Sequence, residues 1–190
     1  MAISAAHRAL LDPKYAAVFD TPTTVDIVET EQDGAGTISF AVSAPSAVLL
    51  GKAGGSIYWL ADQSCADGAI ILECPDGLHV HVIELKRTLN AKSWDKAKRQ
   101  FAGMLTNIRA FSGNCGLPAP VKVTCHLAFQ YNNFGAAPVL AKVLNTPAGP
   151  VAQAAAQWAS KKLDFLEWTD VDVIAVSRDG VGNGHATLGC

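Results

Sequence analysis

A carboxylate and an ammonium, separated by one residue, stand at the end of a segment that is typical of a β-strand. Glu84 and Lys86 flank Leu85 at the end of LHVHVIELK (78–86). Side chains two residues apart on a strand project from the same face. Asp67 comes just before the preceding apolar run, GAIILEC (68–74). Carboxylates beside an ammonium can bind a divalent cation and orient a water molecule, which metal-assisted phosphodiester hydrolysis needs. Taken alone, Glu-x-Lys is very common, and a surface ion pair on an edge strand would be the preferred interpretation.

A hairpin is expected to bring these residues together. Pro75-Asp76-Gly77 separates the two β-rich runs, and this tripeptide favours a turn because Pro presets φ and Gly accepts positive φ. With Cys74 opposite Leu78, Asp67 would fall opposite Leu85, one residue out of face with Glu84. Alignment of the two carboxylates would then need a bulge or another register. Asp76 itself is interpreted as a turn residue, because strand 78–86 holds Glu84 roughly 26 Å away.

The surrounding segments predict an α/β (α+β) fold with a single mixed β-sheet flanked by helices. Asn90 or Ser93 can cap a helix over 93–112, whose apolar residues recur every three or four positions. Strands are expected at 25–32, 37–44, 56–63, 121–131 and 171–176, helices at 137–144 and 151–162, and a loose glycine-rich tail after 177. We expect one domain over 1–190, with a core at about 56–131, a β-rich N-terminal elaboration at 20–50 and C-terminal helices and a strand at 137–176.

Asp67, the Glu84-Leu85-Lys86 triplet and a following helix that carries Gln100 together resemble the PD-(D/E)XK (restriction-endonuclease-like) nucleases. The resemblance covers roughly residues 56–131. The core of that family has the order α-β-β-β-α-β, and the expected elements reproduce all of it except the first helix. Ala66 replaces the proline that usually precedes the aspartate, and Met104 stands where a tyrosine often follows the glutamine.

The resemblance implies a role for each of these residues. Asp67 and Glu84 would bind Mg²⁺ or Mn²⁺, with the carbonyl of Leu85 as a candidate further ligand, Lys86 would orient the attacking water, and Gln100 would support the site. The family also has an upstream glutamate, for which Glu29 and Glu31 are the nearest candidates.

The charge of the chain is unevenly distributed. The formal net charge is −2, yet residues 86–122 hold eight bases and one acid, whereas residues 1–85 hold three bases and eleven acids. Clustered Lys and Arg are typical of a phosphate-binding surface. Five bases, Arg87, Lys92, Lys96, Lys98 and Arg99, are predicted to contact nucleic acid, with DNA favoured over RNA. The alternative interpretation is the solvated face of an amphipathic helix.

The five cysteines are odd in number and lack C-x-x-C spacing, which favours reduced, mostly buried thiols in a cytoplasmic protein. No membrane span is expected, because no apolar run approaches the ~18 residues that one needs. The sequence therefore predicts a metal-dependent nuclease. The alternative is a non-catalytic inhibitor, immunity or assembly component on a degenerate nuclease-like fold, and a homodimer or protein partner is compatible with either.

Overall fold

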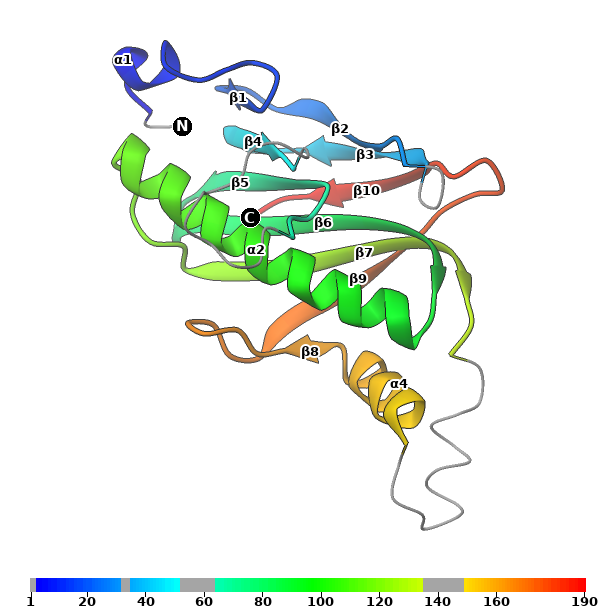
Figure 1. Cartoon of the computed structure of the whole chain (residues 1–190). Coiled ribbons are helices and arrows are strands. Elements are labelled where there is room, and N and C mark those ends of the chain that lie inside the picture. Colours follow the sequence, from blue (N-terminus) through cyan, green and yellow to red (C-terminus); the bar gives the residue numbers. More distant parts are fainter. Residues whose placement is uncertain (1–2, 32–34, 52–63, 135–148) are drawn as a thin grey trace.

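The computed structural model describes residues 3–31, 35–51, 64–134 and 149–190, which form a mixed α/β structure (Figure 1). A seven-stranded mixed sheet has the strand order β1-β4-β5-β6-β7-β9-β8. Strands β6, β7 and β9 run parallel, and the remaining neighbours are antiparallel. The strands of this sheet are β1 (Ala16–Phe19), β4 (Ser46–Leu50), β5 (Gly68–Cys74), β6 (Gly77–Leu89), β7 (Lys122–Asn132), β8 (Lys162–Leu163) and β9 (Val171–Ser177).

The expectation of a single sheet was wrong, because a second sheet has the order β10-β3-β2. Its strands are β2 (Thr23–Glu29), β3 (Gly36–Val42) and β10 (Gly184–Leu188). The expected strands near 25–32 and 37–44 are confirmed as an antiparallel pair. The C-terminal tail is not loose: β10 pairs in parallel with β3, from Gly184 opposite Ile38 to Leu188 opposite Val42.

The helices are α1 (Ala5–Arg8), α2 (Ala91–Cys115) and α4 (Pro150–Ser160). Helix α2 begins with a capping box, in which the Asn90 side chain accepts from the Ser93 backbone N–H and the Ser93 hydroxyl accepts from the Asn90 N–H. It ends at Gly116, whose φ of +66° is the left-handed conformation that glycine favours. The helix expected at 93–112 is thus confirmed and is slightly longer. Segments 56–63 and 137–144 lie outside the described residues.

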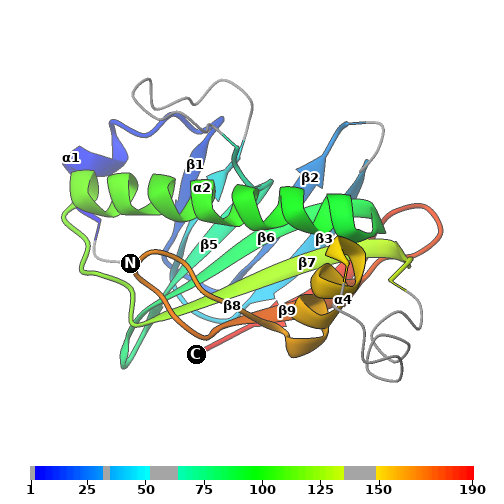
Figure 2. The same cartoon turned by 60° about the horizontal axis from the view of Figure 1, so that its bottom comes forward.

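Two apolar clusters divide the molecule into layers. Figure 2 shows α2 crossing the strands of the large sheet, and its buried residues Trp94, Phe101 and Ile108 pack on one face of that sheet. The small sheet packs its apolar side chains, Ile38 and Phe40 among them, on the opposite face. Strand β5 is therefore buried on both faces, and six of its seven residues are buried.

The β5–β6 hairpin is confirmed, but its register differs from the expected one. Cys74 pairs with Gly77, so Pro75 and Asp76 alone form the turn, and Gly68 pairs with Ile83. Continuing this register by one residue places Asp67 opposite Glu84, with no bulge required. The chain order β5, β6, α2, β7 matches the expected order of hairpin, helix and strand.

Candidate functional site

Asp67 and Glu84 meet at the open end of the β5–β6 hairpin. The Asp67 Oδ2 atom accepts a hydrogen bond of 2.6 Å from the backbone N–H of Leu85. The Asp67 carbonyl in turn accepts from the backbone N–H of Gly51 at 3.0 Å, which ties the segment before β5 to the end of β4. The structure thus brings the two predicted metal carboxylates together from adjacent strands.

Glu84 and Lys86 lie on the face of β6 that is turned toward α2, as alternation predicts. The Glu84 side chain is fully buried, and its Oε1 atom forms an ion pair with the Lys86 Nζ atom. Its Oε2 atom has no hydrogen-bond partner among the described residues. A buried carboxylate oxygen without a partner is costly, so a cation or a water molecule bound to this atom would stabilise it.

Gln100 reaches the same region from α2. Its Nε2 atom donates to the carbonyl of Cys65 at 3.2 Å, two residues before Asp67. Its Oε1 atom is buried and has no partner among the described residues. Asn107 donates to the Cys65 Sγ atom at 3.1 Å, so two α2 side chains hold the segment that leads into Asp67.

The segment that leads into Asp67 is also held by a close approach between its backbone and that of α2. A Cβ atom built on Gly103 of α2 would lie 1.7 Å from the carbonyl oxygen of Ser64, so only glycine lets the two backbones come this close. The position of Asp67 therefore depends on an interior helix residue.

Glu29, at the end of β2, joins the carboxylates from the second sheet. A hydrogen bond links its side chain to that of Asp67, so one of the two carries a proton. Burial, the charge of Glu84 and this hydrogen bond raise the pKa of Asp67 to about 9. Burial disfavours the charge of Glu29, but hydrogen bonds from Asp67 and from the Glu31 and Thr30 backbone outweigh it and lower the pKa of Glu29. Asp67 is thus the proton carrier in the metal-free site.

Burial also raises the pKa of Glu84, to about 7, against the opposing charge of Lys86. Both predicted metal ligands therefore hold protons more tightly than free carboxylates do. A divalent cation would reverse this preference, because it stabilises the ionised form of each ligand.

Arg178 is a site neighbour that the sequence interpretation missed. This buried side chain donates to the carbonyls of Lys86 at 3.1 Å, Ala35 at 2.6 Å and Gly182 at 2.6 Å. Its positive charge also interacts with Asp67 and Glu29. Arg178 therefore ties Lys86, at the end of the Glu84-Leu85-Lys86 triplet, to Ala35 and Gly182.

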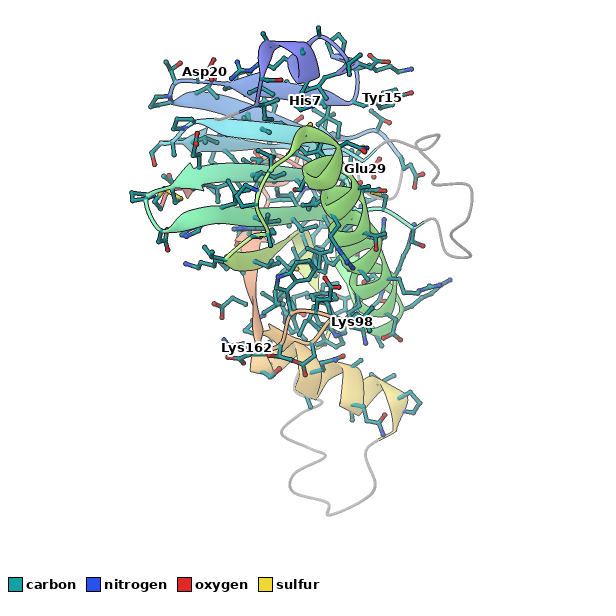
Figure 3. The ribbon with its side chains drawn as sticks, turned by 90° about the vertical axis from the view of Figure 1, so that its left-hand side faces the viewer. His7, Tyr15, Asp20, Glu29, Lys98 and Lys162 are labelled. Atoms are coloured by element: carbon teal, nitrogen blue, oxygen red, sulfur yellow. A yellow bond between two sulfur atoms is a disulfide. The ribbon has the colours of Figure 1, made fainter. Side chains whose placement is uncertain are left out.

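Asp67 and Glu29 border an open cleft of about 950 Å³, whereas the fully buried Glu84 is not among its lining residues. Asp67, Lys86 and Gln100 line it together with Glu29, Glu31 and Asp26, and its other basic residues are Lys14 and Lys96. In Figure 3, Glu29 lies on the β2 side of α2, whereas Lys98 lies toward α4. Lys98 and Arg99 line a separate groove of about 610 Å³ beside 163–168. Arg87 and Lys92 are exposed. Of the five predicted phosphate contacts, only Lys96 thus shares the cleft with Asp67.

The donor set suits a hard cation such as Mg²⁺, which prefers oxygen ligands, uses one or two carboxylates and retains several waters. Within the described ranges, one group of three residues, Cys74, Asp76 and His79, has candidate ligand atoms that all lie within 4.8 Å of one another. The carboxylate oxygens of Asp67, Glu84 and Glu29 do not form such a group, so they are more widely spaced. Two carboxylates, completed by backbone and water oxygens, fit the arrangement better than three carboxylates would.

Comparisons with known proteins give no relative: no family model, curated protein or solved structure matches the chain. Among the described residues, no helix is long and apolar enough to cross a membrane.

Proposed function

We propose that the protein is a metal-dependent nuclease of the PD-(D/E)XK type that hydrolyses phosphodiester bonds of nucleic acid, with DNA favoured. The observation that carries the proposal is the meeting of Asp67, Glu84 and Lys86 at one hairpin end, where a fully buried Glu84 oxygen has no partner in the part of the chain that the structure describes. The order β5, β6, α2, β7, with β6 and β7 parallel, supports a restriction-endonuclease-like core.

Asp67 and Glu84 would hold Mg²⁺ or Mn²⁺, and the Leu85 carbonyl is the further ligand candidate. In an extended strand the N–H and C=O groups of one residue point to the same side, and the Leu85 N–H points to Asp67. The ion would neutralise charge that develops on the phosphate as water attacks phosphorus and the P–O bond breaks.

Side chains around the metal ligands would position the attacking water and the phosphate. Lys86, whose ammonium contacts Glu84 in the absence of metal, lies where it can donate to the attacking water. Gln100 keeps the 64–67 segment in place through Cys65. Its side-chain carbonyl oxygen, which has no partner within the described ranges, could accept from that water. Lys96 is the predicted phosphate contact that lines the same cleft as Asp67.

The test is cleavage of plasmid, linear duplex, single-stranded DNA and RNA with Mg²⁺ or Mn²⁺. Glu84→Gln and Lys86→Met each keep the side-chain volume and are expected to lower the cleavage rate by about 100-fold or more. Asp26→Asn removes an exposed carboxylate from the same cleft and is the matched control, expected to keep wild-type activity. Equal rates in all four proteins would remove the proposal.

Phosphate contacts can be tested separately by the salt dependence of binding in Ca²⁺ or without metal. Lys96→Gln should reduce the slope of log K against log[salt] by about 0.9 on duplex DNA. Lys98→Gln is the matched control, because Lys98 lies on the other groove and pairs with Asp95 at 2.8 Å. A larger effect at Lys98 than at Lys96 would place nucleic acid on the groove beside 163–168.

The second candidate is a non-catalytic binding protein that retains this fold. The charge balance of the cleft favours it. With Asp67 protonated, the carboxylates of Asp26, Glu29 and Glu31 offset the three ammonium groups there, so no net positive charge attracts a polyanion. Calorimetric titration with Mn²⁺ separates the candidates. A nuclease site should bind Mn²⁺ and lose it in Asp67→Asn, whereas absence of binding together with a tight protein partner would support the second candidate.

A further inference from the structure

The turn end of the β5–β6 hairpin gathers metal-ligating side chains outside the proposed nuclease site. Cys74 ends β5, Asp76 lies in the turn and His79 lies on β6, and their ligand atoms are all within 4.8 Å of one another. A disulfide joins Cys74 to Cys190, with their Cα atoms 5.4 Å apart. Reduced thiols were expected at all five cysteines, and this expectation was wrong for Cys74 and Cys190. The bond brings a fourth donor to the group.

His79 is the buried member of this group. Only 4% of the residue is exposed, and its Nε2 atom contacts the Asp76 carboxylate at 2.9 Å. Its Nδ1 atom is buried and has no hydrogen-bond partner among the described residues. Asp76 and Cys190 are exposed, so an ion can reach the group from solvent.

A disulfide and a bound metal ion cannot coexist at these two cysteines, because the metal binds thiolates and the sulfurs of a disulfide are not thiolates. We propose that Cys74, Asp76, His79 and Cys190 form a zinc site when the Cys74–Cys190 disulfide is reduced. Thiolate sulfur, imidazole nitrogen and carboxylate oxygen are all ligands that Zn²⁺ binds, and four of them match its tetrahedral coordination.

The change from the disulfide to the zinc-bound state conserves electrons and protons. A dithiol reductant supplies two electrons and two protons, the S–S bond breaks, and the reductant becomes a disulfide. Zn²⁺ then binds the two thiolates, and the two thiol protons are released to solvent. Oxidation by a disulfide reverses the process and releases the ion.

Strand β10 keeps Cys190 in place in both states. It pairs with β3 over five residues, up to Leu188 opposite Val42, and Ser43 donates to the Leu188 carbonyl at 3.1 Å. Loss of the disulfide therefore leaves the Cys190 sulfur near the hairpin turn. The C-terminal segment would be cross-linked to the hairpin by a disulfide under oxidising conditions and by zinc under the reducing conditions of a cytoplasm.

This site is separate from the proposed nuclease site. His79 and Glu84 are five residues apart along β6, roughly 17 Å at ~3.3 Å per residue. Metal binding at the two places can therefore be measured independently, and the zinc proposal does not depend on nuclease activity.

Co²⁺ is the probe for the test, used on the full chain after reduction with a phosphine. The reduced protein should bind one Co²⁺ with a thiolate charge-transfer band and strong visible bands typical of tetrahedral cobalt, and Zn²⁺ should displace it. The oxidised protein should show neither. Cys190→Ser should remove about half of the charge-transfer intensity, and His79→Ala should weaken binding by about 10-fold to 100-fold.

Two variants control for other sites. Cys65→Ser removes a partly exposed free thiol at the carboxylate cleft, and Asp67→Asn alters the nuclease site; both should keep the wild-type cobalt spectrum. If His79→Ala fails to fold, Asp76→Ser at the exposed turn replaces it and should also weaken binding. A reduced protein without a charge-transfer band would overturn the proposal, and so would an unchanged band in Cys190→Ser.

Discussion

Replacing Asp67 with asparagine is expected to stabilise the metal-free protein at alkaline pH. Asparagine resembles the protonated aspartate, because its carbonyl can still accept from the Leu85 N–H and its amide can still donate to Glu29. The folded protein holds the Asp67 proton up to a pKa of about 9, against 3.8 for an ordinary aspartate. Its contribution to stability is therefore complete below pH ~4 and is lost as pH rises through ~9.

The size of the effect follows from linkage. One pKa unit corresponds to about 1.4 kcal/mol. Asp67 borders an open cleft that water can enter, so its ionised form is better solvated than it would be in a dry interior. We therefore count less than half of the shift from 3.8 to about 9, roughly two pKa units, or about 3 kcal/mol lost by the wild type between acid and alkaline pH. For a chain of this size, that corresponds to a Tm difference of about 6–12 °C.

The assay is urea unfolding with EDTA at several pH values from 4 to 9. The two proteins should have similar stability near the acid end, and Asp67→Asn should become the more stable protein as pH rises. Asp26→Asn, which removes an exposed carboxylate from the same cleft, should follow the wild type. Added Mn²⁺ should then stabilise the wild type but not Asp67→Asn. A stability difference between the two proteins that does not change with pH would refute the reasoning.

Three further predictions concern packing, cross-linking and proton release. Gly103→Ala should lower Mn²⁺ affinity by about 10-fold, because the new Cβ would lie 1.7 Å from the Ser64 carbonyl and displace the segment before the metal ligand. Gly113→Ala, on the same helix with open space around its Cβ, should instead raise stability by up to about 1 kcal/mol, so thermal unfolding distinguishes the two. Cys190→Ser with a chelator present should cost about 3–5 kcal/mol in urea unfolding, because the disulfide closes a loop over a sequence separation of 116. Mn²⁺ affinity should rise from pH 6 to pH 9, because Glu84, with a pKa of about 7, and Asp67, with a pKa of about 9, must both lose their protons; calorimetry in buffers of different ionisation enthalpy should detect this release.

The elements nearest the site could be predicted from the sequence because their signals are local. Helix α2 has a capping residue, Asn90, and an apolar stripe at spacings of three and four. Strand β7 alternates apolar and polar residues, and the hairpin has a turn tripeptide between two β-rich runs. These signals correctly placed Glu84 and Lys86 on one face and Gln100 on the following helix.

Contacts made by the C-terminal segment could not be predicted in this way. GHATL (184–188) is short and contains a glycine and a histidine, so its own preference for a strand is weak. It becomes β10 because β3 offers a free edge to pair with. Cys190 follows β10 and bonds to Cys74, whereas Arg178 directly follows β9 and donates to the Lys86 carbonyl, so the missed disulfide and the missed site residue both come from the C-terminal part of the chain.

The register of the β5–β6 hairpin could not be predicted from the local apolar pattern. A slip of one residue exchanges the two faces of a strand, and it is penalised where one face is buried and the other is exposed. Both faces of β5 are buried, so Ile70 and Ile71 would be acceptable on either side. The apolar pattern therefore does not determine the register of the hairpin. The turn determines the register instead, because Cys74 pairs with Gly77, and glycine can adopt the φ of +134° found there. That pairing carries down the hairpin and sets Asp67 opposite Glu84. The turn that carries Asp76 therefore determines whether the two carboxylates at the other end share a face, and with it whether they can share a metal ion.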